Sequence, residues 1–413
     1  MLGESANNSK SKLILLILYF GWIISYIDRT VISLAIVQIG EDLSLDASKL
    51  GIVLSAFFLG YALMQIPGGW LADRFGSRKV IVIAVLAWSV FTALSGLAWS
   101  LTSLILIRFL FGIGEGGYPA ASTKAISDYF PADKRTKAQS TMMSSNAFGA
   151  ALAPIMCAPL LVAFGWRNVF LLIGLLGIIF VIWFLISTRQ AGNYSNSDIA
   201  NKPSRKEYAE LLRNSYLWRV LLIFFFINIT SWGLISWMPS YLMQGLGIDL
   251  KSVGLISAIP SLFMTIGMII SGRIINKVGS NAKYGVITGI IIMGASLYLM
   301  SSSSSVFQVI MYQCIAFTFM SFIMSFIFTL PHRVMEQKVV GTAFGIINLG
   351  GQAAGIFSPM IMGALIASSG GSYKSAFLFL TICCLVAAVL TCFLPSAKNK
   401  QTATDYSTAE TVN

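Results

Sequence analysis

The chain has 413 residues, of which 56% are hydrophobic and 11% are charged, and its formal net charge is +12. Soluble globular domains are typically about one-quarter charged, so this composition excludes that class. Twelve apolar runs follow one another along the chain, and each has about the 20 residues that a helix needs to cross a bilayer. The sequence therefore predicts an all-α polytopic membrane protein.

The predicted transmembrane helices fall into two groups of six. In chain order they cover residues 13–39, 50–71, 79–97, 103–123, 138–162, 166–188, 217–243, 252–272, 283–300, 304–330, 341–366 and 374–394. Residues 189–216 are rich in Asn, Ser and basic residues and are predicted to be a cytoplasmic linker. The linker separates an N-terminal half, 1–188, from a C-terminal half, 217–394, and a cytoplasmic tail is predicted at 395–413.

Basic residues are distributed unevenly between the two sides of the predicted membrane. If the first helix leaves the cytoplasm, the inner segments hold 22 of the 28 Lys and Arg residues and the outer segments hold 4. The positive-inside rule then places both termini in the cytoplasm. The net positive charge therefore indicates topology, and no nucleic-acid partner is expected.

Four ionisable residues lie near the middle of predicted spans: Asp28 and Arg29 in the first, and Arg108 and Glu115 in the fourth. Each charge at a helix centre costs about 2.5–3.5 kcal/mol on insertion scales, so these residues must pair or face water. Such charges indicate a functional site by default. The alternative is a purely structural set of ion pairs that locks the two helices together.

Helical spacing sorts these charges by direction. One polar face of the first span consists of Trp22, Ser25, Tyr26, Arg29, Thr30 and Ser33. Such a stripe is typical of a helix that lines a water-filled cavity, so Arg29 is predicted to point into the transport path and Asp28 toward a neighbouring helix. Arginine suits a carboxylate, which its planar fork grips with two hydrogen bonds, whereas the two acids suit proton carriage.

The second half offers neutral polar groups in place of charges. On the eleventh span one face carries Gly341, Gly345, Asn348, Gln352, Gly355 and Pro359. The two amides, Asn348 and Gln352, suit substrate hydroxyls. Further candidates are Tyr61, Asn146, Ser321 and Ser325, for which a hydrogen bond between helices is the alternative reading. This asymmetry predicts a substrate with an anionic head and a polar, hydroxylated body.

A short motif occurs twice, at the same place in each half. Gly69–Ser77 and Gly272–Ser280 both follow G-x-x-x-[DN]-[RK]-x-G-S, with Asp73 in the first copy and Asn276 in the second. An internal repeat in this position indicates duplication of a six-helix unit.

Together with GWRNVF at 165–170, the first copy resembles the major facilitator superfamily. YIDRTVISLA at 26–35, RFLFGIGEGGYPA at 108–120 and SWMPSYL at 236–242 resemble its anion:cation symporter branch, which includes bacterial hexonate and hexuronate symporters and vesicular glutamate carriers.

The resemblance implies a role for each matched residue. Asp28 and Glu115 are the implied proton-coupling acids, and Arg29 and Arg108 are the implied partners of the substrate. Around these we place the other predicted substrate-binding residues, namely Tyr26, Tyr61, Asn146, Asn348 and Gln352. The implied gating motif consists of Gly69, Asp73, Arg74, Gly76 and Arg78.

We therefore predict a proton-coupled symporter of a small organic anion, such as a sugar acid, working by alternating access. It is expected to be a multi-pass monomer of the bacterial inner membrane, without cofactor or metal. An exporter or facilitator of another organic anion remains an open alternative. A membrane-embedded enzyme would need a nucleophile–base pair or a metal cluster, and the single histidine, His332, and five scattered cysteines do not suggest one.

Overall fold

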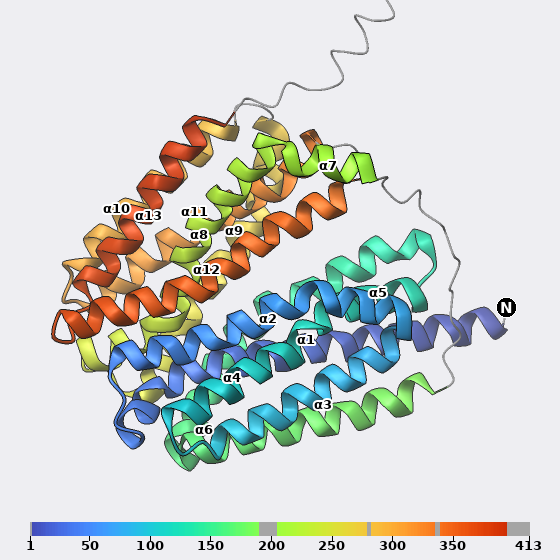
Figure 1. Ribbon diagram of the computed structural model, residues 1–413, viewed down its shortest axis with the longest axis horizontal. Helices are drawn as coiled ribbons and strands as arrows, with labels where there is room; N and C mark the ends of the chain where they lie inside the picture. Colours follow the sequence, from blue (N-terminus) through green and yellow to red (C-terminus); the bar gives the residue numbers. More distant parts are fainter. Residues whose placement is uncertain (1, 190–204, 279–281, 335–338, 395–413) are drawn as a thin grey trace, which may run out of the picture. The chain divides into compact units, whose positions relative to one another are not determined.

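The structure is a computed structural model that describes residues 2–189, 205–278, 282–334 and 339–394. The predicted tail, 395–413, and most of the predicted linker, 190–204, lie outside the described residues. The described chain contains these helices in order: α1 (Leu2–Asp42), α2 (Ala47–Phe75), α3 (Ser77–Gly96), α4 (Leu101–Gly116), α5 (Tyr118–Tyr129), α6 (Ala132–Thr188), α7 (Arg205–Arg213), α8 (Ser215–Ser240), the π-helix η1 (Tyr241–Gly245), α9 (Leu250–Val278), α10 (Ala282–Ser301), α11 (Val306–Val334), α12 (Val340–Ser368) and α13 (Lys374–Cys392) (Figure 1).

Eleven helical segments among the described residues are long and apolar enough to cross a membrane. One of them, Asp133–Thr188, contains both the fifth and the sixth predicted span. Its helix α6 is interrupted at Gly165, where φ is 71° and ψ is 162°. Glycine adopts this backbone conformation without the penalty that a Cβ brings, so the kink divides α6 into two arms. The predicted all-α fold with twelve membrane-crossing segments is thereby confirmed.

The chain forms two compact units, and each is described here by itself. The first unit comprises Met1–Ser197, Gly233–Ser261 and Gly355–Tyr373, and the second comprises Asp198–Trp232, Leu262–Ala354 and Lys374–Asn413. The first unit thus joins α1 to α6 with parts of α8, α9 and α12.

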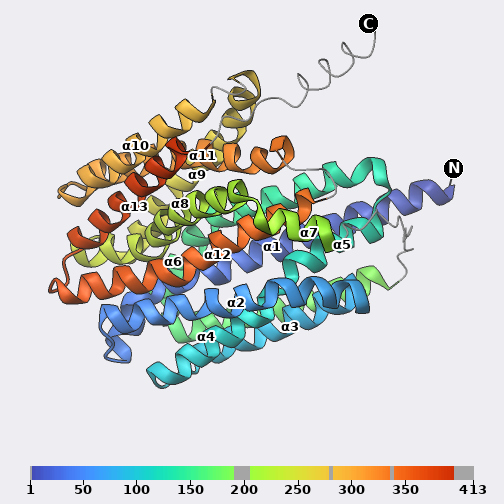
Figure 2. The same cartoon turned by 45° about the horizontal axis from the view of Figure 1, so that its top comes forward.

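Within the first unit, α1 packs along α6, α2 along α4, and α3 along both α4 and α6 (Figures 1 and 2). Glycines allow α2 and α4 to approach backbone to backbone. A Cβ on Gly60 would collide with the carbonyl oxygen of Phe109, and a Cβ on Gly112 would collide with that of Phe57. This close crossing is typical of membrane helices with small residues at the interface. It holds the aromatic residues of α2 against the charged residues of α4.

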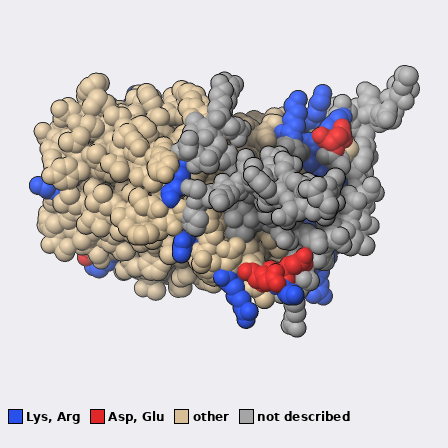
Figure 3. All heavy atoms as spheres, turned by 90° about the horizontal axis from the view of Figure 1, so that it is seen from above, with Lys and Arg blue, Asp and Glu red and all other residues tan. Residues whose placement is uncertain are grey.

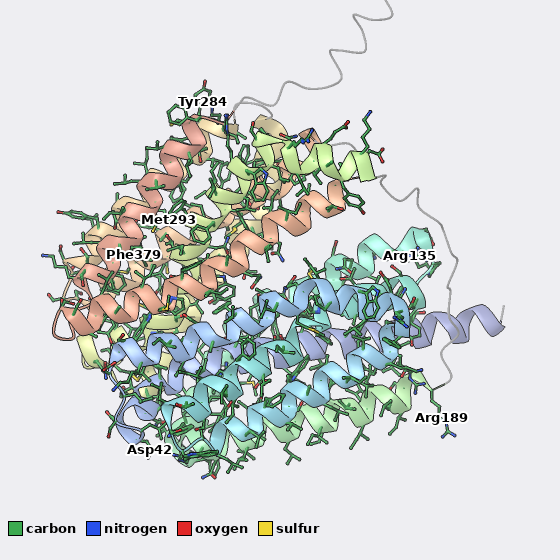
Figure 4. The ribbon with its side chains drawn as sticks, in the orientation of Figure 1. Asp42, Arg135, Arg189, Tyr284, Met293 and Phe379 are labelled. Atoms are coloured by element: carbon green, nitrogen blue, oxygen red, sulfur yellow. The ribbon has the colours of Figure 1, made fainter. Side chains whose placement is uncertain are left out.

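The first unit has two chemically different ends. Asp42 lies at one end and Arg135 and Arg189 lie at the other, as labelled in Figure 4; we call them the Asp42 end and the Arg135 end. At the Asp42 end, the Asp42 carboxylate accepts hydrogen bonds from Trp166 Nε1 at 3.1 Å and Arg167 Nε at 3.0 Å. Arg167 also donates to the carbonyl of Ala98 at 2.7 Å. These contacts tie the ends of α1, α3 and the second arm of α6 together.

In the second unit α10 packs between α11 and α13. The interior of this unit includes Met293 of α10 and Phe377 of α13. Tyr284, which is labelled in Figure 4, is exposed near the start of α10. The described residues of α8 and of α10 to α13 include no carboxylate within their helices. The second unit therefore differs from the first, whose α1 and α4 bury acids.

The surface of the protein is apolar to a degree that only a membrane accommodates. Ile66 of α2 is 77% exposed and Ile186 of α6 is 71% exposed. On the face in Figure 3, uncharged residues cover most of the left part of the view, and Lys, Arg, Asp and Glu gather toward the right part. Extended apolar surface of this kind marks contact with lipid.

Candidate functional site

The centre of the candidate site is an ion pair between α1 and α4. Arg29 Nε donates to Glu115 Oε1 at 2.7 Å, and the side chains are 9% and 1% exposed. Ser25 Oγ, one turn before Arg29 on α1, donates a short hydrogen bond to the same oxygen. Glu115 therefore has two donors on one carboxylate oxygen, and both come from α1.

Three aromatic rings surround the guanidinium of Arg29. Its Cζ lies 4.5 Å from the ring centroid of Tyr61, 5.4 Å from that of Phe57 and 5.5 Å from that of Tyr26. A cation held over aromatic faces is stabilised by the quadrupole of each ring, and more so where water is scarce. These three rings stabilise the charge of Arg29 in the membrane interior while leaving some of its N–H groups without a hydrogen bond.

Asp28 and Arg108 are as buried as Glu115, each 1% exposed. Thr92 of α3 donates from Oγ1 to Asp28 Oδ1 at 3.0 Å. The guanidinium of Arg108 lies 4.4 Å from the ring centroid of Phe111. Among the described residues no carboxylate comes within ion-pair distance of Arg108, although Asp28 and Glu115 are close enough to interact with it electrostatically.

Each of the four charged groups has a buried atom without a hydrogen-bond partner in the described part of the chain. These atoms are Asp28 Oδ2, Arg29 Nη2, Arg108 Nε and Nη1, and Glu115 Oε2. Buried polar groups are normally satisfied, because an unsatisfied one costs the full desolvation penalty. Each of the four charged groups therefore keeps at least one polar atom that a further hydrogen-bond partner could bind.

The structure brings some predicted substrate-binding residues together with this ion pair. Tyr26 and Tyr61 face Arg29, as described above. Asn146 of α6 is half-buried in the same unit, and its Oδ1 has no hydrogen-bond partner among the described residues. Of the predicted stripe on α1, Tyr26 and Arg29 keep partial exposure, whereas Ser25 is fully buried against α4. Trp22 and Ser33 of the same stripe are also buried, and the role of this face in lining a cavity stays a prediction.

The predicted amide groups of the eleventh span belong to the second unit. Asn348 and Gln352 of α12 are both half-buried, and Gln352 Oε1 lacks a hydrogen-bond partner within the described chain. In α11, Ser321 donates to the carbonyl of Thr318, and Ser325 shares a hydrogen bond with Ser271 of α9. Ser325 therefore makes the hydrogen bond between helices that was the alternative reading, whereas Ser321 bonds to the backbone of its own helix.

Gly355 and Pro359, the last two residues of the predicted stripe on α12, pack tightly in the first unit, whereas a Cβ on Gly345 would meet nothing within 4 Å. A Cβ on Gly355 would collide with the ring of Phe58, and Pro359 lies against Gly51 of α2, where a Cβ would come 2.6 Å from the Pro359 oxygen. Trp237 Nε1 donates to the same oxygen at 3.0 Å. These contacts close α12 onto α2 toward the Asp42 end.

The predicted gating motif lies where α2 meets α3. Gly76 has φ 85°, which explains glycine there, since nothing else crowds the position. Asp73 pairs with Lys124 of α5 at 3.7 Å, and Arg78 donates to Thr188 Oγ1 at 2.9 Å. The other members of the motif make looser contacts: Gly69 faces Ala120, and the guanidinium of Arg74 lies over the ring of Trp70.

The sequence did not predict several residues that contact the four buried charges and the gating motif. Thr92 and Phe57 contact the charged residues, and Lys124 binds Asp73. Lys124 also pairs with Asp128 at 3.8 Å, and Ser77 donates to Asp128 at 2.5 Å. Hydroxyls and apolar rings are common in membrane helices, so their residue types carry no signal. The side chains of Asn276 and His332 lie outside the described residues.

Comparison with known proteins adds two kinds of similarity. The sequence profile of the Major Facilitator Superfamily matches residues 18–359. A probable sulfoacetate transporter, SauU, of Cupriavidus necator is 32% identical, and the alignment covers 88% of each chain. A probable L-galactonate transporter of Escherichia coli is 30% identical over 91% of this chain and 86% of the relative.

Among solved structures, the fold is similar to that of a bacterial homologue of the human lysosomal transporter Spinster in its inward-facing and occupied conformation. The TM-score is 0.81, the sequences are 20% identical, and the match covers 94% of this chain and 97% of that one. At this level of identity the likeness concerns the fold alone.

Proposed function

The chain belongs to the Major Facilitator Superfamily, and from this premise we propose that it carries a small organic anion across the membrane together with protons. It is a multi-pass membrane transporter and not an enzyme, as the sequence motifs predicted. The two relatives described above are named for organic anions, one a sulfonate and the other a sugar acid. Proton coupling is the finer proposal, and the contacts of the four buried charges support it.

The observation that carries the proposal is the half-made ion pair between Arg29 and Glu115. Arg29 binds through Nε alone, so Nη2 stays without a partner, and Glu115 keeps Oε2 without one. A substrate oxyanion needs two parallel N–H groups to be held in a bidentate way. Such a substrate therefore competes with Glu115 for Arg29, and protonation of Glu115 decides the competition in favour of the substrate.

Ser25 makes the protonated state of Glu115 tolerable in a buried site. An arginine has donors only and cannot accept the new O–H of a protonated carboxyl, whereas a hydroxyl both donates and accepts. Ser25 already contacts the same carboxylate oxygen. When Glu115 is protonated and Arg29 turns to the substrate, Ser25 Oγ can accept a hydrogen bond from the O–H of the acid, so that this buried donor is not left without a partner.

The charges of the site favour coupled movement. With both acids ionised, Asp28, Arg29, Arg108 and Glu115 sum to zero, and each proton that binds leaves one positive charge in excess. An anion therefore enters the protonated site more readily than the ionised one. One pH unit supplies about 1.4 kcal/mol per proton, which is the scale on which a gradient drives accumulation.

We further propose that the amides of Asn348 and Gln352 bind the hydroxyl groups of the substrate. Both residues are half-buried on one face of α12. The same helix closes on α2 through Pro359 and Gly51 toward the Asp42 end. Alternating access then requires these contacts to open so that the substrate can pass that end of the path.

The proposal is tested by uptake into proteoliposomes. Sulfoacetate, L-galactonate and a hexuronate form the panel, and the anion that raises the melting temperature most is used, because ligand stabilises the native state by mass action. A pH gradient, acid outside, should drive uptake above equilibrium, and a protonophore should abolish it. Uptake that only equilibrates would indicate a facilitator and contradict proton coupling.

Variants separate coupling from binding. In the double variant Asp28→Asn, Glu115→Gln, accumulation driven by the pH gradient should be lost while exchange of internal for external substrate survives. The matched control is Asp42→Asn, which removes a carboxylate that pairs with Arg167 at the Asp42 end; it should keep accumulation. If the double variant still accumulates substrate, the proposal of proton coupling is wrong and the four charges have a structural role.

A further inference from the structure

We propose that Thr92 of α3 is the positioning residue of Asp28, and that its hydroxyl donates to the ionised carboxylate and accepts from the protonated one. This inference rests on the proposed function, because it gives Asp28 a proton to bind and release. It adds a third helix to a site that sequence motifs place on α1 and α4 alone. The geometric basis is the 3.0 Å hydrogen bond from Thr92 Oγ1 to Asp28 Oδ1.

The direction of the Thr92 hydroxyl distinguishes it from the two nearest hydroxyls on the same helix, Ser89 and Ser95. Ser89 donates to the carbonyl of Val85, and Ser95 donates to that of Phe91. Bonds of this kind, to the backbone one turn earlier, are the usual choice of Ser and Thr within helices. Thr92 lies between these two serines and reaches instead to a carboxylate on α1.

Both groups are sealed from solvent. Thr92 is 0% exposed and Asp28 is 1% exposed. Thr92 is the one hydrogen-bond partner that the described residues give to the Asp28 carboxylate, since Oδ2 has none. A charge in such a place depends strongly on its single donor, because hydrogen bonds to charged groups are roughly twice as strong as those between neutral groups.

Other titratable groups act on Asp28 without touching it. From the helices packed around it these are Arg29 of α1, Arg108 and Glu115 of α4, and Cys157 of α6. None of them makes a hydrogen bond to Asp28 in the described chain. The two arginines cannot accept a hydrogen bond, so neither can bind the O–H of protonated Asp28. Thr92 can bind Asp28 in both protonation states, and the acid keeps a partner throughout its cycle.

The prediction concerns the pH at which Asp28 titrates. Thr92→Val keeps the shape and removes the hydroxyl, so the ionised acid loses a stronger bond than the protonated acid does. The midpoint of Asp28 protonation should therefore move to higher pH by about 0.5–1 unit. Thr92→Ser, which retains the hydroxyl, should restore the wild-type midpoint.

The measurement is infrared difference spectroscopy of the full-length protein in lipid, as a function of pH. The carbonyl band of protonated Asp28 is identified by its loss in Asp28→Asn. In Thr92→Val this band should persist to higher pH and move to higher wavenumber, because the O–H of the protonated acid loses its hydrogen-bond acceptor. Thr391→Val is the matched control, since Thr391 is equally buried but donates to the carbonyl of Ala387; it should leave the band unchanged.

The outcomes separate this inference from the proposed function. An unchanged midpoint in folded Thr92→Val, or a wild-type Asp28 band that does not respond to pH, would overturn the role of Thr92. If Thr92→Val does not fold, Thr92→Cys replaces it, because a thiol is a weaker donor of similar size and should give a smaller shift in the same direction. If the midpoint shifts as expected but a pH gradient fails to drive uptake, the proposed function fails and the positioning role stands.

Discussion

Replacing Glu115 by Gln should make the carrier bind its anion more tightly while it ceases to be driven by protons. In the wild type the substrate must displace Glu115 from Arg29, whose Nε lies 2.7 Å from Oε1. Gln keeps the size and can still accept from Arg29 and Ser25, but only as a neutral group. The substitution therefore mimics the protonated acid and removes the competitor for the guanidinium.

The expected gain in affinity follows from the hydrogen bond between Arg29 and ionised Glu115, which the substrate must break in the wild type but not in the variant. A hydrogen bond to a charged group is worth about 1.5–3 kcal/mol net, and every 1.4 kcal/mol is a factor of ten in affinity. The neutral amide retains about 0.5–1.5 kcal/mol of this, which leaves a difference of about 1–1.5 kcal/mol, so we expect the affinity of Glu115→Gln to exceed that of the wild type by roughly 5- to 15-fold at a pH where Glu115 is ionised. At lower pH the two proteins should converge. The empty variant should also melt earlier, because the buried Arg29 loses its counter-charge.

Isothermal titration calorimetry of purified protein with the selected anion, repeated across pH, measures this effect. Asp42→Asn serves as the control, since Asp42 also binds an arginine but is 45% exposed at the Asp42 end; its affinity should equal that of the wild type. A Glu115→Gln variant that binds more weakly than the wild type, or equally at every pH, would refute the competition between Glu115 and the substrate.

Three further predictions follow from the same contacts. Arg29→Lys keeps the charge but loses the planar fork, so affinity should fall at least about tenfold; near wild-type affinity in the titration would make Arg29 structural. Asp73→Asn removes the exposed partner of Lys124, so the melting temperature should hardly change while turnover in proteoliposomes falls and affinity stays; a loss of affinity with normal turnover would contradict gating. The backbone N–H of Lys49 lies 2.9 Å from Oδ1 of Asp46 and holds the pKa of this carboxyl below its ordinary value. The cap therefore stabilises the fold above about pH 4, and its stabilisation is lost as the pH falls through the lowered pKa. The melting temperature of Asp46→Asn, measured against pH, should lack this acid-dependent step.

The fold was predictable because the bilayer constrains sequence so strongly. A helix that crosses the apolar core needs about 20 apolar residues, and each of the predicted spans meets this requirement. The same constraint exposed Asp28, Arg29, Arg108 and Glu115, since ionisable groups at mid-span are costly and therefore rare. Residue type alone thus located the charged centre.

The sequence also indicated one local break that the structure contains. Gly165 separates the fifth and sixth predicted spans, and a positive φ divides α6 there. The break of the fourth span at Gly117, between α4 and α5, was not predicted. At that position φ is −81°, within the ordinary helical region, and the break coincides with a proline in the first turn of α5, Pro119, which has no backbone N–H to donate to the preceding turn.

Only the tertiary structure decided which groups meet. Helical spacing places Arg29 and Ser25 on one face of α1 but does not say which acid they contact. In the structure both contact Glu115 of α4. The choice depends on the glycines that let α2 and α4 approach, and on how α1 lies beside them, which are properties of several helices at once. Thr92 was undetectable for the same reason: a hydroxyl costs little in a membrane helix and usually binds its own backbone, so its reach to Asp28 follows from where α3 lies against α1.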